Sequence, residues 1–266
     1  MMSDRQRGAI DALEFVVRTP SRVRILELLH EEGPVSRSTL RSELDVVRTT
    51  LQRNLTGLAE RGLLRERERT YELTSAGELV TAGLSGTLDR IDAAMRLRPV
   101  LERLPSGTFA FDLDRLLDAT VVESTAANPY APVDYHAASL ADADRARLTL
   151  PATGHDPLEQ ARDALDAGAT VDLVVTDSVA EAFRSEPPIA DAFASIADSD
   201  GLTVSVAADE IPFYLGIVDD AVQFGVHDES DLPTALLETT DDRVTEWADE
   251  RFERLAEQAT PLSETS

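Results

Sequence analysis

The 266-residue sequence predicts two domains of different fold class, a small α+β domain followed by a larger mixed α/β domain. Its length exceeds the ~100–200 residues of an ordinary domain. The spacing of apolar residues is helical at first and becomes a mixture of strands and helices after Pro105. Residues 1–80 hold 13 arginines and 13 acidic residues, whereas residues 81–266 hold 12 and 37, so the net charge of −25 lies entirely in the later part. We therefore assign residues 9–74 to the first domain, 75–103 to a connecting helix and 104–262 to the second domain.

The first domain is expected to contain four short helices and a ribbon. Residues 9–18 are amphipathic, and Thr19-Pro20 then provides a cap and a first-turn proline for a helix that ends at Gly33-Pro34. Ser36 caps a third helix. The buried face of the fourth is marked by Leu51, Leu55 and Leu58, and residues 63–74 form two strands with a charged tip.

This order resembles a winged helix-turn-helix DNA-binding domain. The segments that carry the resemblance are, in chain order, Ser21–Leu29, Pro34–Leu40, Arg48–Leu55, Leu58–Leu64 and Tyr71–Gly77. The pattern departs at Val47, where such domains usually have serine or a similar cap. Asp45 is the alternative cap, which leaves the first residue of the recognition helix open by one or two positions. The resemblance implies double-stranded DNA as a partner.

Three polar groups are candidates for DNA contact. Arginine pairs with guanine and asparagine or glutamine with adenine, which favours the fourth helix as the base reader. The arginines of the ribbon alternate with glutamates, so they share one strand face that suits phosphates, and a helix start also favours a phosphate. The candidates are Ser36, Arg37, Ser38, Arg48, Thr49, Thr50, Gln52, Arg53, Asn54, Arg65, Arg67 and Arg69. The alternatives are a solvated helix face, a charge-paired ribbon edge, and a Ser36 that only caps.

The second domain is expected to mix strands and helices. Short strands at 108–111 and 119–123 flank a helix at 112–118, and an irregular loop spans 124–136. A helix from Asp156 to Gly168, a buried strand at 170–176, a helical region at 178–198 and a strand at 202–206 follow, in an order that predicts parallel pairing. A hairpin turning at Asp219-Asp220 and a helix over 241–258 complete the chain.

This domain resembles the C-terminal effector domain of archaeal winged-helix regulators in the methanogenesis and filament regulator family, which is common in haloarchaea. The residues that carry the resemblance are Asn128–Pro132, Ala169–Thr176, Pro212–Asp220 and Glu246–Ala248. All 25 basic residues are arginine, and an acidic chain without lysine is similar to haloarchaeal proteins. The resemblance implies a homodimer joined through residues 75–103, and an effector domain that senses a small molecule or mediates oligomerisation.

Aromatic and polar side chains beside the strand ends are candidates for contact with an effector. The candidates are Asn128, Tyr130, Tyr135, His136, Phe213 and Tyr214. Loops next to strand ends are frequent ligand sites in α/β folds. The alternative is a proline-stiffened connector whose tyrosines pack on the core.

The composition excludes several classes of enzyme. Without lysine there is no Schiff base and no GxxxxGK[ST] loop, and without cysteine there is no thiolate nucleophile or disulfide. The four histidines lack the spacing of a helical metal site, so we expect no metal and no cofactor. No run approaches the ~18–20 apolar residues of a membrane span, and the N-terminus lacks a signal-peptide core, which predicts a cytoplasmic protein.

The sequence therefore predicts a sequence-specific DNA-binding transcriptional regulator that is dimeric and not an enzyme. The alternative is that the second domain is a small-molecule enzyme or a degenerate enzyme, with the winged helix used for protein contacts. The two hypotheses differ in whether Arg48 and Arg53 are needed for DNA binding.

Overall fold

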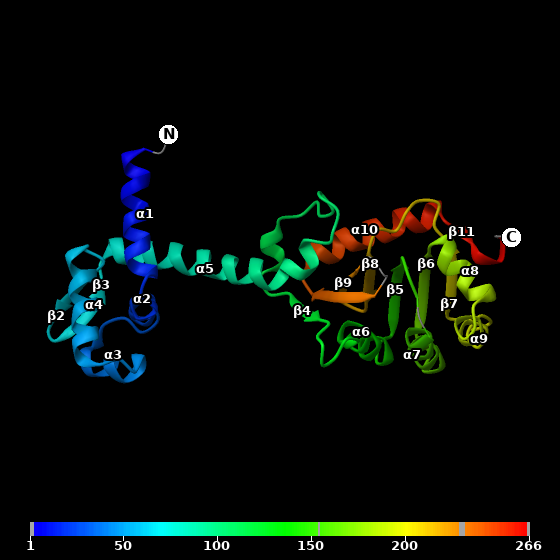
Figure 1. Cartoon of the computed structure of the whole chain (residues 1–266), viewed down its shortest axis with the longest axis horizontal. Helices are drawn as coiled ribbons and strands as arrows, with labels where there is room; N and C mark the ends of the chain where they lie inside the picture. Colours follow the sequence, from blue (N-terminus) through cyan, green and yellow to red (C-terminus); the bar gives the residue numbers. More distant parts are fainter. Residues whose placement is uncertain (1–2, 154, 229–231, 265–266) are drawn as a thin grey trace. The chain divides into compact units, whose positions relative to one another are not determined.

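The computed structural model describes residues 3–153, 155–228 and 232–264, which fall into two compact units divided between Ile91 and Asp92 (Figure 1). The division lies inside one long helix, α5 (Ser75–Leu101). The first unit holds 14 arginines and 14 acidic residues, so the boundary also separates a neutral unit from one that carries the whole charge of −25.

The first unit is a helical cluster with a small antiparallel sheet. Its elements are α1 (Asp4–Val17), α2 (Pro20–Glu32), β1 (Val35–Ser36), α3 (Arg37–Leu44), α4 (Arg48–Glu60), β2 (Leu64–Arg67), β3 (Thr70–Leu73) and the first part of α5. The sheet has the order β1-β3-β2, and the core combines apolar residues of every helix with the buried side of the ribbon. The predicted winged helix-turn-helix architecture is therefore present.

The first helix begins earlier than the sequence predicted. It starts at Asp4 rather than Ala9, because Ser3 and Gln6 form a capping box: the Ser3 hydroxyl accepts from the Gln6 N–H, and the Gln6 side chain accepts from the Ser3 N–H.

The second unit is an eight-stranded sheet covered by helices on both faces (Figure 1). After the end of α5, its elements are a 3₁₀ turn (Leu113–Leu116), β4 (Thr120–Glu123), α6 (Ala131–Ala141), β5 (Arg145–Leu150), α7 (His155–Asp166), β6 (Thr170–Val175), α8 (Asp177–Ser185), α9 (Ile189–Ala194), β7 (Leu202–Val206), β8 (Tyr214–Val218), β9 (Ala221–His227), β10 (Pro233–Thr239), α10 (Asp242–Gln258), β11 (Thr260–Pro261) and a last 3₁₀ turn (Leu262–Glu264). The strand order is β11-β7-β6-β5-β8-β9-β10-β4.

The pairing of the strands divides this sheet into a parallel and an antiparallel part. Strands β5, β6 and β7 are parallel, as the strand–helix–strand order predicted. Strands β8 and β9 form the predicted hairpin, with Val218 opposite Ala221. Helix α10 and the end of α5 cover one face with the first core, and α6, α7, α8 and α9 cover the other face with the second core.

Several elements of the second unit differ from the prediction. Residues 108–111 form no strand, because Phe109 and Phe111 instead pack their rings against Trp247. Residues 112–118 contain only the 3₁₀ turn. The expected loop at 124–136 gives way to α6 at Ala131, since Pro132 lies in the first helical turn, where proline is tolerated. The helical region at 178–198 is two helices separated by Pro187-Pro188, and β5 and β10 were not predicted.

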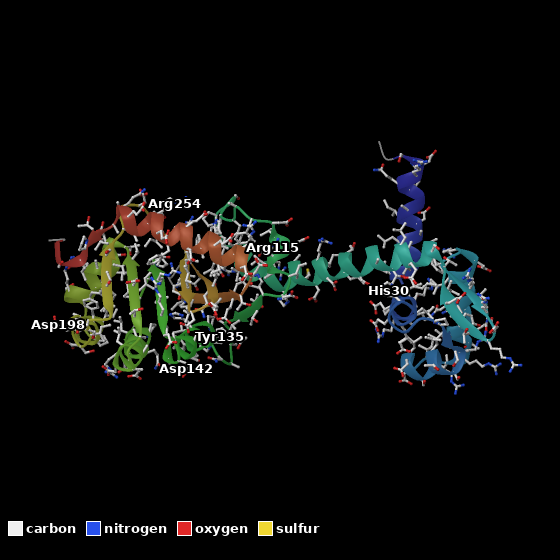
Figure 2. The ribbon with its side chains drawn as sticks, turned by 180° about the vertical axis from the view of Figure 1, so that it is seen from behind. His30, Arg115, Tyr135, Asp142, Asp198 and Arg254 are labelled. Carbon is white, nitrogen blue, oxygen red and sulfur yellow. The ribbon has the colours of Figure 1, made fainter. Side chains whose placement is uncertain are left out.

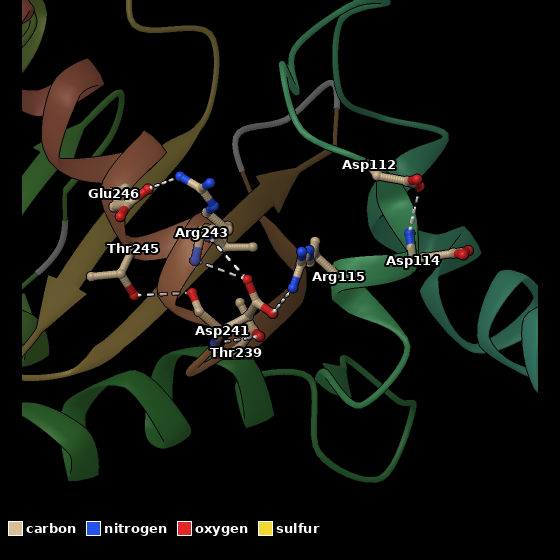
Figure 3. A network of polar contacts seen from close by, with 9 residues as sticks. Asp112, Asp114, Arg115, Thr239, Asp241, Arg243, Thr245 and Glu246 are labelled. Atoms are coloured by element: carbon tan, nitrogen blue, oxygen red, sulfur yellow. Dashed lines mark hydrogen bonds and ion pairs between the residues drawn. The ribbon is translucent and has the colours of Figure 1, made fainter.

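A polar network fixes the start of α10 (Figure 3). The Asp241 carboxylate accepts from the backbone N–H groups of Arg243 and Val244 at 2.9 and 3.3 Å, which makes Asp241 the N-cap. Arg115, from the 3₁₀ turn, lies 3.5 Å from the same carboxylate. This network ties the segment that follows α5 to the helix that closes the fold.

Candidate nucleic-acid interface and ligand cavity

Helix α4 presents one polar face to solvent. Its apolar side chains Leu51, Leu55 and Leu58 are buried in the first-unit core, which turns the other side of the helix outward. Four of the predicted DNA-contacting residues lie exposed there, namely Arg48, Thr49, Gln52 and Arg53, and Thr50 is half-buried. The helix starts at Arg48 after Val47, which caps it without a side-chain hydrogen bond. Asp45 is not the alternative cap, because it ends α3 in a left-handed conformation with φ of 45°.

Asn54 corrects the prediction for this helix. Its side chain is fully buried, donates to the Ser21 hydroxyl at 2.8 Å and accepts from the Arg22 Nε at 3.2 Å. Because Asn54 is one helical turn from Leu51 and Leu58, it shares their inward face. It joins α4 to α2 and is not placed to reach a base.

Sequence reasoning missed a group of arginines beside α4. The ring of Phe15 lies between the guanidinium groups of Arg22 and Arg61, at 3.8 and 3.3 Å from its centroid. Burial lowers the pKa of Arg22, and the positive charges of Arg53, Arg61 and Arg18 lower it further. We call Arg18, Arg22, Arg53 and Arg61 the arginine cluster. Arg53 was already a candidate from the sequence. The other three gave no signal, because the end of α1, the start of α2 and the end of α4 meet only through the packing of the helices.

The start of α3 joins the wing through a tyrosine. The Ser36 hydroxyl accepts from the Thr39 N–H at 3.2 Å, so it caps the helix as predicted. Ser38 is exposed, whereas Arg37 donates to the Tyr71 hydroxyl at 2.5 Å. That hydroxyl in turn donates to Glu66 at 2.9 Å. Arg37 therefore positions the wing, and its guanidinium is already hydrogen-bonded.

The wing does not carry its three arginines on one strand face. Arg65 is ion-paired with Glu72, its direct cross-strand partner, at 2.6 Å. Glu68 and Arg69 form the turn, both with positive φ, so Arg69 lies at the tip and outside the strand alternation. Arg67 and Arg69 are exposed. All three arginines of the wing are thus exposed, and Arg65 differs from the other two in its ion pair within the ribbon.

A cavity of about 470 Å³ lies in the second unit between the sheet and helices α6 and α7. Three of the six predicted effector contacts line it: Tyr130, His136 and Tyr214. Asn128 and Tyr135 do not line the cavity. Tyr135 nevertheless lies on α6, the helix that also carries His136 (Figure 2). Phe213 packs in the core on the opposite face of the sheet, because it is adjacent to Tyr214 and neighbours in a strand point to opposite faces.

A buried polar network lies against this cavity. Gln223 donates from Nε2 to Glu238 at 2.7 Å, which turns its amide oxygen toward His136 Nδ1 at 2.8 Å. The Tyr214 hydroxyl lies 3.0 Å from the same nitrogen. Burial lowers the pKa of His136 and raises the pKa of Tyr214 well above its usual value. Both side chains are therefore uncharged at neutral pH.

Tyr135 binds the other end of this network. Its hydroxyl donates to Glu238 Oε1 at 2.7 Å, and this hydrogen bond, with burial, raises the pKa of Tyr135 to about 12. The tyrosine is therefore a structural partner of β10 and faces the network from outside the cavity.

Two family models match the chain on either side of residue 100. Residues 10–96 match the model described as the HVO_A0261 N-terminal domain. Residues 129–258 match the model described as the middle domain of the methanogenesis regulatory protein FilR1. The chain therefore contains a domain of the FilR1 middle-domain type, preceded by a domain of the HVO_A0261 N-terminal type. The resemblance found in the sequence is thereby confirmed, and the cavity of the FilR1-type domain lies within the matched residues.

Two solved structures similar to this chain have low sequence identity to it. TrmBL2, an archaeal chromatin protein, is 15% identical, with 89% of this chain and 98% of that chain covered and a TM-score of 0.42. NucT from Helicobacter pylori is 11% identical, with 54% and 98% covered and a TM-score of 0.43. No curated protein matches the chain.

Within residues 3–153, 155–228 and 232–264, no three histidine, aspartate or glutamate side chains are grouped to hold a metal ion. Nor does any helix in the described part combine the length and the apolar character that a membrane span requires.

Proposed function

We propose that the chain is a sequence-specific, DNA-binding transcriptional regulator that acts as a homodimer and responds to a small molecule. The observation that carries the proposal is the outward face of α4, where Arg48, Thr49, Gln52 and Arg53 project from a helix whose other side is locked into the core. Arginine and glutamine at such positions suit the base edges of the major groove. The matches of both halves of the chain to domain models named for regulatory or related proteins support the same interpretation.

Local charge supports DNA contact in spite of the acidic total. The first unit is neutral overall, but the arginine cluster extends from the recognition helix to the start of α2. Among the described residues, the one carboxylate paired with any of its four members is Glu14, at 3.7 Å from Arg18. A phosphate a few ångströms from the arginine cluster experiences mainly the positive potential of that cluster. The negative charge of the second unit is screened by salt. We place phosphate contacts at the arginine cluster and at Arg67 and Arg69 of the wing.

Exposed apolar side chains support a homodimer. Ile10, Leu13 and Val17 lie about one turn apart along α1, and Leu79 and Val80 are exposed near the start of α5. Apolar stripes on helices of this kind are usually covered by another surface. A second copy of the chain would present the same stripe, which suits the two-fold symmetry of most homodimers.

The double variant Arg48→Ala/Arg53→Ala tests the proposal. Random-sequence duplexes enriched by binding to the full chain supply the DNA, and fluorescence anisotropy gives the affinity. We expect the variant to lose about tenfold or more in affinity, because each well-placed arginine contributes about 1–3 kcal/mol. Circular dichroism checks that the fold is intact.

Arg24→Ala is the matched control. Arg24 lies on α2 in the same unit and is ion-paired on the surface with Glu27 and Glu31. Its removal takes away one positive charge, half of the change in the double variant, without touching α4. Its affinity should stay near wild type. Unchanged binding by the double variant would remove the proposed function and leave the protein-contact role of the winged helix.

A further inference from the structure

The described residues that line the cavity in the second unit carry no formal charge. Among the described residues that line it, none is aspartate, glutamate or arginine, although such residues make up 28% of the chain. Most of the lining is aliphatic, contributed by residues such as Leu140, Leu148, Leu158 and Ala161. The neighbouring hollow, of about 360 Å³, is different, since Arg103, Glu210 and Asp228 line it. Among the described residues, charged side chains therefore line the 360 Å³ hollow but not the 470 Å³ cavity.

Two glycines leave the space in which the Tyr214 hydroxyl lies beside His136. Tyr214 on β8 lies directly opposite Gly225 on β9, where a Cβ would come within 3.0 Å of the tyrosine side chain. Gly216 is two residues further along β8 on the same face, and a Cβ there would meet the tyrosine hydroxyl at 2.1 Å. The absence of both side chains lets the ring lie along the sheet toward His136. The hydroxyl and the imidazole are thus held together in a largely apolar cavity, whose other polar lining residues are Tyr130, Thr153 and His227.

We infer that this cavity binds an uncharged, largely apolar small molecule that carries one hydrogen-bonding group, with that group directed at Tyr214 and His136. The volume of about 470 Å³ falls in the usual range for small-molecule sites, about 300–1,000 Å³. A charged ligand would be desolvated among lining residues without a counter-charge, which is unfavourable. The carboxylate beside the network, Glu238, already accepts from Tyr135 and Gln223. Aliphatic walls complement an alkyl or ring portion, and the phenol and imidazole complement a hydroxyl or carbonyl group.

A matched pair of probes tests the charge requirement. 1-Octanol and octanoate have the same chain length, but only octanoate is charged at pH 7.5. Isothermal titration of each into the full chain gives the affinity, and the fluorescence of Trp247 during heating gives the thermal shift. We expect saturable binding of octanol and at least tenfold weaker binding of octanoate. Comparable or tighter binding of octanoate, or no saturable binding of octanol, would overturn the inference.

Substitutions locate the binding. Ala161→Phe fills the cavity from α7 and should abolish octanol binding. Ala152→Leu fills it from a half-exposed position after β5, so it serves if Ala161→Phe does not fold. Tyr214→Phe keeps the ring and should weaken binding severalfold by removing the hydroxyl. Ala138→Phe, an exposed position on α6, is the control and should bind as wild type. Binding that survives both filling variants would place the site elsewhere and refute the inference.

The regulatory meaning of this binding rests on the proposed function, whereas the binding itself does not. Arg48→Ala/Arg53→Ala should retain octanol binding while losing DNA binding. Loss of DNA binding by that variant with octanol binding intact supports both proposals. Octanol binding in a protein whose DNA binding does not depend on these arginines would support the cavity assignment alone.

Discussion

Asn54 and Gln52 lie two residues apart on α4 yet face different surroundings. Asn54 is buried between Ser21 and Arg22, whereas Gln52 is exposed and hydrogen-bonded only to Thr56 on its own helix. Asn54→Ala should therefore lower the free energy of unfolding by about 1–3 kcal/mol, the range for a buried polar group that loses its partner. Urea denaturation measures this, and the sequence preference on DNA should stay unchanged. For Gln52→Ala we expect the opposite result. The free energy of unfolding should be unchanged, and the preference for one base pair of the DNA site should be weaker. A change in base preference on Asn54→Ala would contradict the assignment.

His136 makes the stability of the second unit depend on pH. Burial lowers its pKa in the folded state, whereas in the unfolded chain the pKa returns to about 6.5. Between these two values the unfolded state binds more protons, so the stabilising contribution is complete above pH 6.5 and is lost as the pH falls below it. We expect the Trp247-detected melting temperature to drop from pH 7.5 to pH 5.5. His136→Gln cannot titrate and should show a smaller drop over the same interval. An equal drop in both proteins would assign the effect to other groups.

At the scale of the element, the wing separates two arginines proposed to contact phosphates from one that is ion-paired within the ribbon. Arg67 and Arg69 project, whereas Arg65 is paired with Glu72 across the strands. Arg67→Ala and Arg69→Ala should each lower the magnitude of the salt slope of DNA binding by about one, as expected when one phosphate contact is lost. Arg65→Ala should leave the slope unchanged. The slopes follow from anisotropy titrations at several KCl concentrations, and an equal loss for Arg65→Ala would count against this division.

Elements with a local signal were predictable from the sequence, whereas partners distant in the chain were not. The Ser36 cap, the hairpin at Asp219-Asp220 and the helix after Asp241 all follow from residues within four positions of each other. The ion pair of Arg65 and the burial of Asn54 depend on a strand register and a helix contact. The cavity depends on Gly225, which lies 11 residues from Tyr214 in the sequence. The role of this glycine could not be predicted, because it follows from the pairing of β8 with β9.

For the whole molecule, charge separates the two units as clearly as structure does. The unit beyond Ile91 carries 36 acidic residues and 11 arginines, so its folded state concentrates like charges, whereas the first unit is balanced. Screening such repulsion stabilises the compact state. We therefore expect the second unit to melt at a higher temperature in 2 M KCl than in 0.1 M KCl, with a much smaller change for the first unit.

The single tryptophan makes this prediction measurable. Trp247 lies on α10 and packs against Phe109, Phe111 and Phe224, so its fluorescence reports unfolding of the second unit alone. Far-UV circular dichroism follows both units, and the transition that tryptophan does not detect belongs to the first. Sucrose strengthens burial without screening charge and serves as the control. A tryptophan-detected melting temperature that responds to sucrose as strongly as to KCl would show that general effects of co-solvents on burial, and not the separated charge, set the response to salt.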